Sequence, residues 1–241
     1  MPTTGPDSLL GQPGASPAVC IDHSLLAPTT TAAQIDQLCE EAVEFGCAAV
    51  CVPPVRVAQA AQLLYGSGVA VATVIGFPLG YDSPATKQAA AAEALRQGAR
   101  EIDLVLQLGW AAQGDFAAVT EEIRAIKQLL GQVCLKVIVE CALFEAATRE
   151  RLAVCALEAG ADFVKTSTGF GPAGATPADV RLLRDATAGR LPVKAAGGIR
   201  SLAQFDALRA AGASRIGTSA TAAIVGQWLE RREQAEMRAH V

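Results

Sequence analysis

Short apolar runs alternate with longer segments of helical periodicity along almost the whole chain. Segments with apolar positions on one helical face span 31–44, 85–97, 116–130, 148–159, 178–188 and 202–211. Between them lie short runs rich in β-branched residues, which are typical of buried strands. Eight such runs are centred near Cys20, Val50, Thr73, Leu104, Val137, Val164, Val193 and Ile216, so that neighbouring centres lie 30, 23, 31, 33, 27, 29 and 23 residues apart. The pattern therefore predicts eight strands that alternate with helices.

The ends of several predicted helices carry the residues expected there. Ser83-Pro84 and Thr176-Pro177 each combine an N-capping hydroxyl with a proline at the first helical position. Gly98, Gly160 and Gly212 follow helical segments, where a glycine can end the helix. Each of these glycines is followed by alanine and then by a strand, which indicates one repeated supersecondary unit.

Strands that alternate with helices favour parallel pairing through right-handed crossovers. Eight nearly equal units close most simply into a (β/α)8 TIM barrel, a single-domain α/β fold. An open doubly wound sheet is the alternative, but it normally has a glycine-rich turn after its first strand. Here that strand leads into IDHSLLAPTT, which contains no glycine. We expect a leader over 1–17, the barrel over 18–230, and the end of the last helix as a tail over 231–241.

Composition narrows the class of protein further. The chain has 241 residues, of which 51% are hydrophobic and 18% charged, and its net charge is -4. A chain that is disordered throughout has low hydrophobicity and a high net charge, so this composition excludes that class. A mildly acidic balance gives no electrostatic footprint for a nucleic acid. No apolar run reaches the roughly 18 residues of a membrane span, and the first residues do not resemble a signal peptide. We therefore expect no nucleic-acid or membrane partner and a cytoplasmic location.

Cysteine and histidine usage bears on metal sites and redox state. The seven cysteines include no CxxC pair, and reduced thiols are their expected state. With two histidines in the chain, His23 and His240, a histidine-rich metal site is excluded.

Three charged residues interrupt apolar strands. Lys165 and Lys194 lie 29 residues apart on neighbouring predicted strands, and Asp103 lies within a third. Buried lysine is rare without a partner. A lysine attacks a carbonyl only as the neutral amine, and its usual pKa of about 10.4 falls in apolar surroundings beside a second ammonium. The set predicts Schiff-base chemistry, with Asp103 as a partner or proton carrier; a plain buried ion pair is the alternative.

Glycine-rich turns follow the last two predicted strands. AAGGIRS contains Gly197 and Gly198, and GTSATAA contains Gly217 and Ser219. Each turn opens a helix, and backbone N–H groups at helix starts bind phosphate well. Barrels commonly hold a phosphate at the loops after strands 7 and 8. We predict a phosphate site here, with Arg200 as a nearby cation.

Several motifs together resemble the deoxyribose-phosphate aldolase family of class I aldolases. They are VCV at 50–52, TVIGFPLG at 73–80, EIDLV at 101–105, KVIVE at 136–140, ADFVKTSTGFG at 161–171, VKAAGGIR at 193–200 and RIGTSA at 215–220. The resemblance spans about 21–223. It implies reversible cleavage of 2-deoxy-D-ribose 5-phosphate to D-glyceraldehyde 3-phosphate and acetaldehyde, with no metal and no organic cofactor.

The resemblance also assigns roles to residues. It makes Lys165 the Schiff-base lysine, Lys194 the lysine that perturbs it, and Asp103 the acid–base group. Further residues that it implies in substrate or phosphate binding are Asp22, Thr168, Gly169, Gly197, Gly198, Gly217 and Ser219. The partner is then a small phosphorylated sugar, and a homodimer is compatible with the family.

The chain departs from the family pattern at several positions. Ala27 and Pro53 replace a lysine and an asparagine that are common there, and Gln107 replaces another asparagine. Cys141 replaces a threonine, and the tail has no tyrosine. These departures leave two alternatives open: a related Schiff-base aldolase or transaldolase-like barrel with another carbonyl donor, and a non-catalytic barrel that binds a sugar phosphate.

Cys51 lies at the end of the second predicted strand, near the expected site. Its plain interpretation is a small barrel residue. Acetaldehyde can condense to unsaturated aldehydes that react with thiolates, so we also predict that Cys51 is a point of inactivation. Cys51→Ala should keep its activity in acetaldehyde for longer than the parent enzyme. Loss of activity at the parent's rate would contradict this hypothesis.

Overall fold

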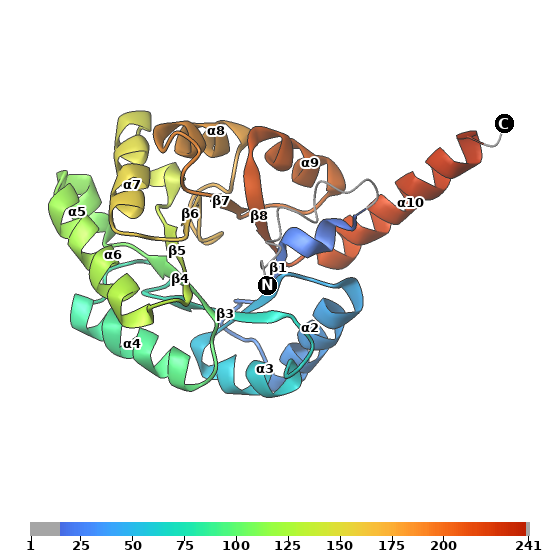
Figure 1. Ribbon diagram of the computed structural model, residues 1–241, viewed down its shortest axis with the longest axis horizontal. Helices are drawn as coiled ribbons and strands as arrows, with labels where there is room; N and C mark the ends of the chain where they lie inside the picture. The colour runs from blue at the N-terminus through green and yellow to red at the C-terminus, as the bar shows by residue number, and fades with distance from the viewer. Residues whose placement is uncertain (1–14, 240–241) are drawn as a thin grey trace.

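Eight parallel strands close into a barrel in the order of the chain (Figure 1). The protein is seen in a computed structural model that describes residues 15–239. Neighbouring strands pair in sequence order, and the first also pairs with the last. The strands are β1 (Ile21–Ser24), β2 (Ala49–Val52), β3 (Ala70–Ile75), β4 (Glu101–Val105), β5 (Cys134–Ile138), β6 (Phe163–Lys165), β7 (Val193–Ala196) and β8 (Ala213–Thr218). The predicted (β/α)8 barrel is confirmed.

Helices surround the strands, and α10 extends well beyond the barrel (Figure 1). The α-helices are α2 (Ala32–Phe45), α3 (Val57–Leu63), α4 (Pro84–Arg96), α5 (Leu108–Gln113), α6 (Phe116–Leu130), α7 (Ala146–Glu158), α8 (Pro177–Ala186), α9 (Leu202–Ala211) and α10 (Thr221–Ala239). Short 3-10 helices lie at Pro17–Cys20, Pro54–Arg56 and Cys141–Leu143.

Capping residues explain where several helices begin and end. Ser83 and Thr176 accept hydrogen bonds from the first turns of α4 and α8, as the sequence predicts. At α8 the Asp179 carboxylate accepts in return from the Thr176 backbone, which completes a capping box. Gly212 ends α9 with a φ of 110°, a conformation that costs a side-chain-bearing residue more than glycine.

Alternation along the strands separates two interiors. Residues such as Val50, Leu104, Val137 and Ile216 point outward into the main apolar core against the helices. The inward positions of β2 and β3 form a second apolar group of Ala49, Cys51, Ala72 and Val74. Charged residues occupy inward positions of the other strands, for example Asp103 on β4, Lys136 on β5 and Lys165 on β6. The inside of the barrel is therefore apolar on one side and ionic on the other.

Some local features differ from the expectations. The chain forms two short helices that the periodicity did not predict, α3 and α5, each of which is at most two turns long. β1 begins at Ile21 because the residues around Cys20 form a 3-10 turn. Of the leader expected over 1–17, residues 1–14 lie outside the described part. Within residues 15–239 no helix is long and apolar enough to cross a membrane.

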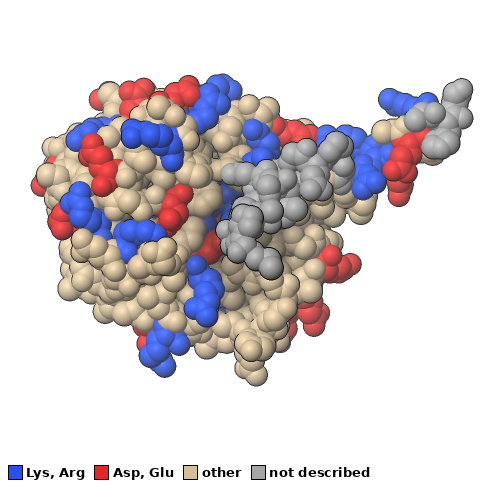
Figure 2. Space-filling view, viewed as in Figure 1, with Lys and Arg blue, Asp and Glu red and all other residues tan. Residues whose placement is uncertain are grey.

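Charged side chains on the outer surface are mixed in sign. Figure 2 shows basic and acidic groups interspersed over the face that is in view. The charges that matter for chemistry lie inside the barrel instead.

Candidate active site

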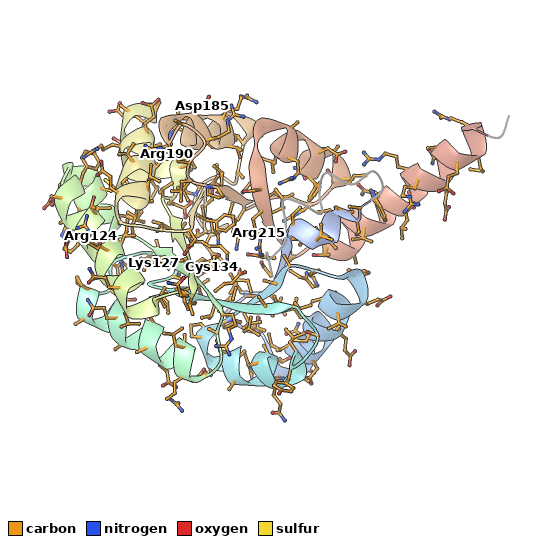
Figure 3. The ribbon with its side chains drawn as sticks, viewed as in Figure 1. Arg124, Lys127, Cys134, Asp185, Arg190 and Arg215 are labelled. Carbon is orange, nitrogen blue, oxygen red and sulfur yellow. The ribbon has the colours of Figure 1, made fainter. Side chains whose placement is uncertain are left out.

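Seven charged side chains meet inside the barrel, and we call them the charge cluster. They come from six strands, because inward positions of parallel strands converge on the barrel axis. The members are Asp22, Glu101, Asp103, Lys136, Lys165, Lys194 and Arg215, all of them less than 9% exposed. Arg215 reaches into the barrel from β8 (Figure 3).

Asp103 occupies the centre of the charge cluster. Its Oδ2 accepts hydrogen bonds from Lys165 Nζ at 2.7 Å and from Lys194 Nζ at 2.6 Å. Its Oδ1 accepts from Lys136 Nζ at 2.9 Å. One carboxylate therefore touches three ammonium groups. Strand register explains the meeting, since Asp103 lies opposite Lys136 on β5, and Lys165 lies opposite Lys194 on β7.

Asp22, Glu101 and Arg215 complete the cluster. Asp22 Oδ2 accepts from Lys194 Nζ at 2.5 Å, and its Oδ1 accepts from Arg215 at 2.6 Å. Glu101 lies 2.5 Å from Lys136 Nζ and 3.5 Å from an Arg215 nitrogen. Buried charges need such partners, because each loses its hydration on folding.

Electrostatics keep the central carboxylates ionised. Burial would raise the pKa of Asp103, but the ammonium groups of Lys136, Lys165 and Lys194 outweigh it and hold that pKa well below its usual range. At Asp22 burial also acts upward, and Lys194, Lys136 and Arg215 together lower the pKa. Both groups are therefore hydrogen-bond acceptors throughout the physiological range.

The two predicted lysines differ in their protonation. Burial lowers the pKa of Lys165, the Asp103 carboxylate raises it, and the ammonium of Lys194 lowers it, so that the net result lies below the usual value. Burial also lowers the pKa of Lys194, but Asp103 and Asp22 together raise it above the usual value. Lys165 is the better nucleophile of the two, because more of it is the neutral amine.

The charge count points the same way. Three carboxylates in the cluster face four basic groups. A cluster removed from water is most stable when its charges balance. Loss of one proton from Lys165, which touches a single carboxylate, achieves that balance.

A pocket of about 360 Å³ opens above the cluster at the carboxyl ends of the strands. We call it the central pocket. Its walls are the loops that follow β1, β6, β7 and β8, with residues Ser24, Leu25, Leu26, Ala27, Pro28, Thr168, Gly169, Phe170, Ala196, Gly197, Gly198, Ile199, Arg200, Gly217, Thr218 and Ser219. Lys165 is the one member of the charge cluster that lines it. A ligand in the pocket therefore meets the amine with the lowered pKa.

Two segments rich in glycine form one wall of the central pocket. We call residues 196–200 and 217–219 the glycine loops. Gly197 has a φ of 94° and packs so closely that a Cβ on it would lie 3.0 Å from the Gly174 Cα. The loop after β8 leads directly into the first turn of α10, where backbone N–H groups lack helical partners. Such a wall suits an anion.

Glu140 supports the loop that follows β6. This residue has a φ of 47°, an unusual conformation for a non-glycine residue. Its buried carboxylate accepts from the Thr168 hydroxyl at 2.5 Å and from the Thr168 backbone at 3.2 Å. Gly171 leaves room for it, since a Cβ there would lie 3.0 Å from the carboxylate carbon. Glu140 thus holds the segment that follows Lys165.

Cys51 lies in the apolar group on β2 and β3 and is 1% exposed. Burial is the largest influence on its thiol and raises the pKa to about 11. The reactive thiolate is scarce at neutral pH in that setting. The expected inactivation at Cys51 stays a prediction.

The structure brings most of the predicted site residues together. Lys165, Lys194 and Asp103 are in direct contact, and Thr168, Gly169, Gly197, Gly198, Gly217 and Ser219 line the central pocket. Asp22 has a different place from the one expected, beneath the pocket and bonded to Lys194 and Arg215. Among the residues that the structure describes, no group of His, Cys, Asp and Glu is arranged to hold a metal ion.

Sequence reasoning did not include Glu101, Lys136 and Arg215 in the site. A usable signal exists for each of them. Glu101 lies two residues from Asp103, Lys136 lies between the apolar Leu135 and Val137, and Arg215 precedes the apolar Ile216 in its strand. Period-2 alternation places all three on the inward face, which could have identified the full cluster.

Comparison with known proteins agrees with this geometry. The DeoC/LacD family aldolase model matches residues 17–226. A deoxyribose-phosphate aldolase of Syntrophotalea carbinolica is 48% identical over 218 residues, which cover 90% of this chain and 99% of that protein. Another, of a Geobacillus species, is 46% identical over 209 residues, covering 86% of this chain and 94% of that protein.

Solved structures show the same similarity. The structure described as QR15, an aldolase, has a TM-score of 0.85 and 38% identity, and the match covers 88% of this chain and 96% of that one. The tetrameric deoxyribose phosphate aldolase of Aeropyrum pernix has a TM-score of 0.83 and 34% identity, covering 88% and 90% of the two chains.

The charge cluster predicts a large effect of Lys136 on stability. Lys136→Met removes the cation between Asp103 and Glu101 and leaves buried carboxylates with less compensation. We expect the free energy of unfolding to fall by about 3–5 kcal/mol, measured by urea denaturation. Arg124→Met, which breaks an exposed pair on α6 (Figure 3), is the control and should change it by about 1 kcal/mol or less. Equal effects of the two variants would contradict the importance of buried charge balance.

Proposed function

The chain belongs to the DeoC/LacD aldolase family, and on that basis we propose that it cleaves 2-deoxy-D-ribose 5-phosphate reversibly to D-glyceraldehyde 3-phosphate and acetaldehyde. It is a class I aldolase, a lyase that works through a Schiff base. The observation that carries the proposal is Lys165, a buried lysine with a lowered pKa that faces the central pocket.

The first half of the reaction forms the Schiff base. The neutral Lys165 amine attacks the C1 aldehyde of the open-chain sugar, and loss of water from the resulting carbinolamine gives an iminium ion. Asp103 bridges Lys165 and Lys194, so it can carry the protons that leave the nitrogen and reach the departing hydroxyl. The positively charged iminium at Lys165 remains in contact with the Asp103 carboxylate, which stabilises it.

The second half breaks the C2–C3 bond. A base removes the proton of the C3 hydroxyl, the C2–C3 electron pair moves toward the iminium nitrogen, and C3 leaves as the aldehyde of glyceraldehyde 3-phosphate. The remaining enamine takes a proton at C2, and water then releases acetaldehyde and the free amine. The Asp103–Lys194 pair lies next to this nitrogen and is the nearest proton carrier. We therefore assign Lys194 to tuning and proton transfer rather than to attack.

The glycine loops supply the opposite end of the substrate site. Gly197, Gly198, Gly217 and Ser219 lie together on one wall of the central pocket, with Arg200 beside them. A phosphate bound there would meet backbone N–H groups, the start of α10 and a guanidinium group. Thr168 and Gly169 also line the central pocket and suit the sugar hydroxyls.

Self-association and location belong to the same proposal. The tetrameric relative from Aeropyrum pernix supports a homo-oligomer of at least two chains. The seven cysteines of the chain include no CxxC pair, which suits a reducing compartment such as the cytoplasm.

One departure from the family pattern touches the site directly. Ala27 lines the central pocket, whereas Pro53 lines an adjoining apolar cavity. Neither residue contacts the charge cluster. A changed carbonyl donor is therefore the alternative that these departures support, and the non-catalytic alternative has no observation in its favour.

Reductive trapping tests the nucleophile. Incubation with deoxyribose 5-phosphate and borohydride should reduce the imine and leave an adduct on the peptide that contains Lys165, located by mass spectrometry. Lys165→Met should form no adduct and lose about 10⁴-fold or more of its turnover. Lys127→Met, on the outside of the barrel (Figure 3), should behave as the parent does. An adduct on Lys194 would reverse the two roles, and an adduct formed only with another donor would favour the alternative aldolase.

The pH profile tests the role of Lys194. Lys194→Met removes a cation that lowers the pKa of Lys165, and Asp103 then raises that pKa with less opposition. The nucleophile must be neutral, so activity is lost below its pKa and the acid limb of kcat/KM should move to higher pH. A displacement of one pH unit corresponds to about tenfold lower kcat/KM below the limb. Lys194→Arg keeps the charge and should leave the limb in place; a slower Lys194→Met with an unmoved limb would instead make Lys194 a proton-transfer group alone.

A further inference from the structure

His23 is a buried side chain that the mechanism does not use. It lies on β1, directly after Asp22, and alternation therefore points it outward from the barrel. It is 4% exposed. Two other elements meet at its ring. Its Nε2 lies 2.9 Å from a Glu41 oxygen on α2, and its Nδ1 lies 2.9 Å from the Thr221 hydroxyl on α10.

The partners determine the hydrogen-bond directions. The hydrogen bond with His23 lowers the pKa of Glu41, so this carboxylate is ionised and accepts. Nε2 of His23 therefore donates. In the neutral ring Nδ1 is then an acceptor, and the Thr221 hydroxyl donates to it. Gln37 donates to the second Glu41 oxygen at 2.7 Å, which further fixes the carboxylate.

Thr221 is the first residue of α10 and is fully buried. It follows the glycine loop of residues 217–219, and Ser219 in that loop lines the central pocket. A second hydrogen bond involves the glycine loop of residues 217–219, because the Thr218 hydroxyl donates to the Ile199 carbonyl at 2.6 Å. The Thr218 bond joins the two glycine loops to each other. The His23 bond joins the start of α10 to the barrel wall and to α2.

A second, smaller pocket of about 210 Å³ adjoins this part of the site. His23, Glu41, Gln34 and Gln37 line it, and it shares Ser24, Leu25 and Ser219 with the central pocket. The loop that carries Ser219 is thus a thin wall between two cavities. A thin wall needs a fixed support to hold its backbone N–H groups in place, and the Thr221–His23–Glu41 chain is the support on this side.

We propose that His23 is a positioning residue for phosphate binding. It acts through Thr221 and not through contact with the substrate. It fixes the N-terminal end of α10 and the adjoining glycine loop, so that the first N–H groups of the helix point at the phosphate. The inference rests on the proposed function for the identity of the anion. It adds a group outside the pocket that sets affinity for the phosphorylated end of the substrate.

Three variants separate the two bonds of His23. His23→Gln can reach Glu41 but leaves the Thr221 hydroxyl without its acceptor. His23→Asn places an amide oxygen near the position of Nδ1 and can still accept from Thr221. Thr221→Val removes the hydroxyl at nearly constant size. Thr120→Val is the matched control, because it removes a similarly buried hydroxyl from α6, away from the central pocket.

The readout compares substrates with and without phosphate. For deoxyribose 5-phosphate we expect KM to rise about three- to tenfold in His23→Gln and Thr221→Val, with kcat little changed, as for loss of one buried hydrogen bond. His23→Asn should recover most of that loss. The inhibition constant of inorganic phosphate should rise by the same factor. For unphosphorylated 2-deoxyribose, kcat/KM should stay within about twofold of the parent in all variants.

Other outcomes overturn the inference. An equal fall in kcat/KM for both sugars would give His23 a general structural role, as would the same effect in Thr120→Val. Unchanged phosphate affinity in His23→Gln and Thr221→Val would remove the positioning role altogether. If the parent cleaves neither sugar, the proposed function fails instead. Calorimetric titration of each variant with inorganic phosphate then still decides the role of His23.

Discussion

Charge balance inside the barrel is the constraint on which the site depends. Seven charged groups are packed where little water reaches them, and each one is tolerable only because another is within hydrogen-bonding distance. Three carboxylates against four basic groups leave one proton in excess. Lys165 is the basic group with the fewest carboxylate contacts, so the surplus proton leaves from there. Folding itself thereby favours the neutral amine at Lys165, since the arrangement that satisfies the carboxylates also disfavours the ammonium form of this lysine.

The division of the barrel interior gives Lys165 two different sets of neighbours. On one side are Asp103 and Lys194, which in the proposed mechanism exchange protons and stabilise positive charge. On the other side are Cys51 and Val74 in the apolar group of β2 and β3. An imine forms by loss of water and is preserved where water is scarce, whereas its charged form needs an anion. A barrel with charges on every inward position would hydrate the intermediate, and a wholly apolar one would not activate the amine.

The sequence predicted the barrel and the three central residues because both signals are local. Eight apolar runs at regular spacing are visible without any tertiary contact, and a lysine inside VKTS or VKAA is conspicuous against apolar neighbours. Lys136 and Arg215 are just as buried, and Lys136 also lies between apolar neighbours, so a local pattern does not say which buried cations belong to the centre of the site. Their importance depends on strand register, which sets Asp103 opposite Lys136 and brings Arg215 to Asp22. Register also decides that Lys194 contacts two carboxylates, those of Asp22 and Asp103, whereas Lys165 contacts that of Asp103 alone. This difference cannot be read from the sequence around either lysine.

The proposed function builds the affinity for phosphate and the chemistry at the Lys165 amine from separate parts of the fold. The charge cluster lies on the strands, whose hydrogen-bonded ladder holds it rigidly, whereas the glycine loops begin at the last residues of β7 and β8, continue past the strand ends and need other support. Gly197 and Gly198 provide backbone shape but no side chain that could anchor the loop. The anchors must therefore come from residues around them: Thr218 within the loops, and Thr221 with His23 behind them. The phosphate group of the sugar does not react, but its binding energy can hold C1 of the sugar at Lys165. This requires glycine loops that do not move when the phosphate binds. A side chain that never touches the substrate can thus contribute to kcat/KM for the phosphorylated sugar, because it makes the distance between the two ends of the site a property of the fold.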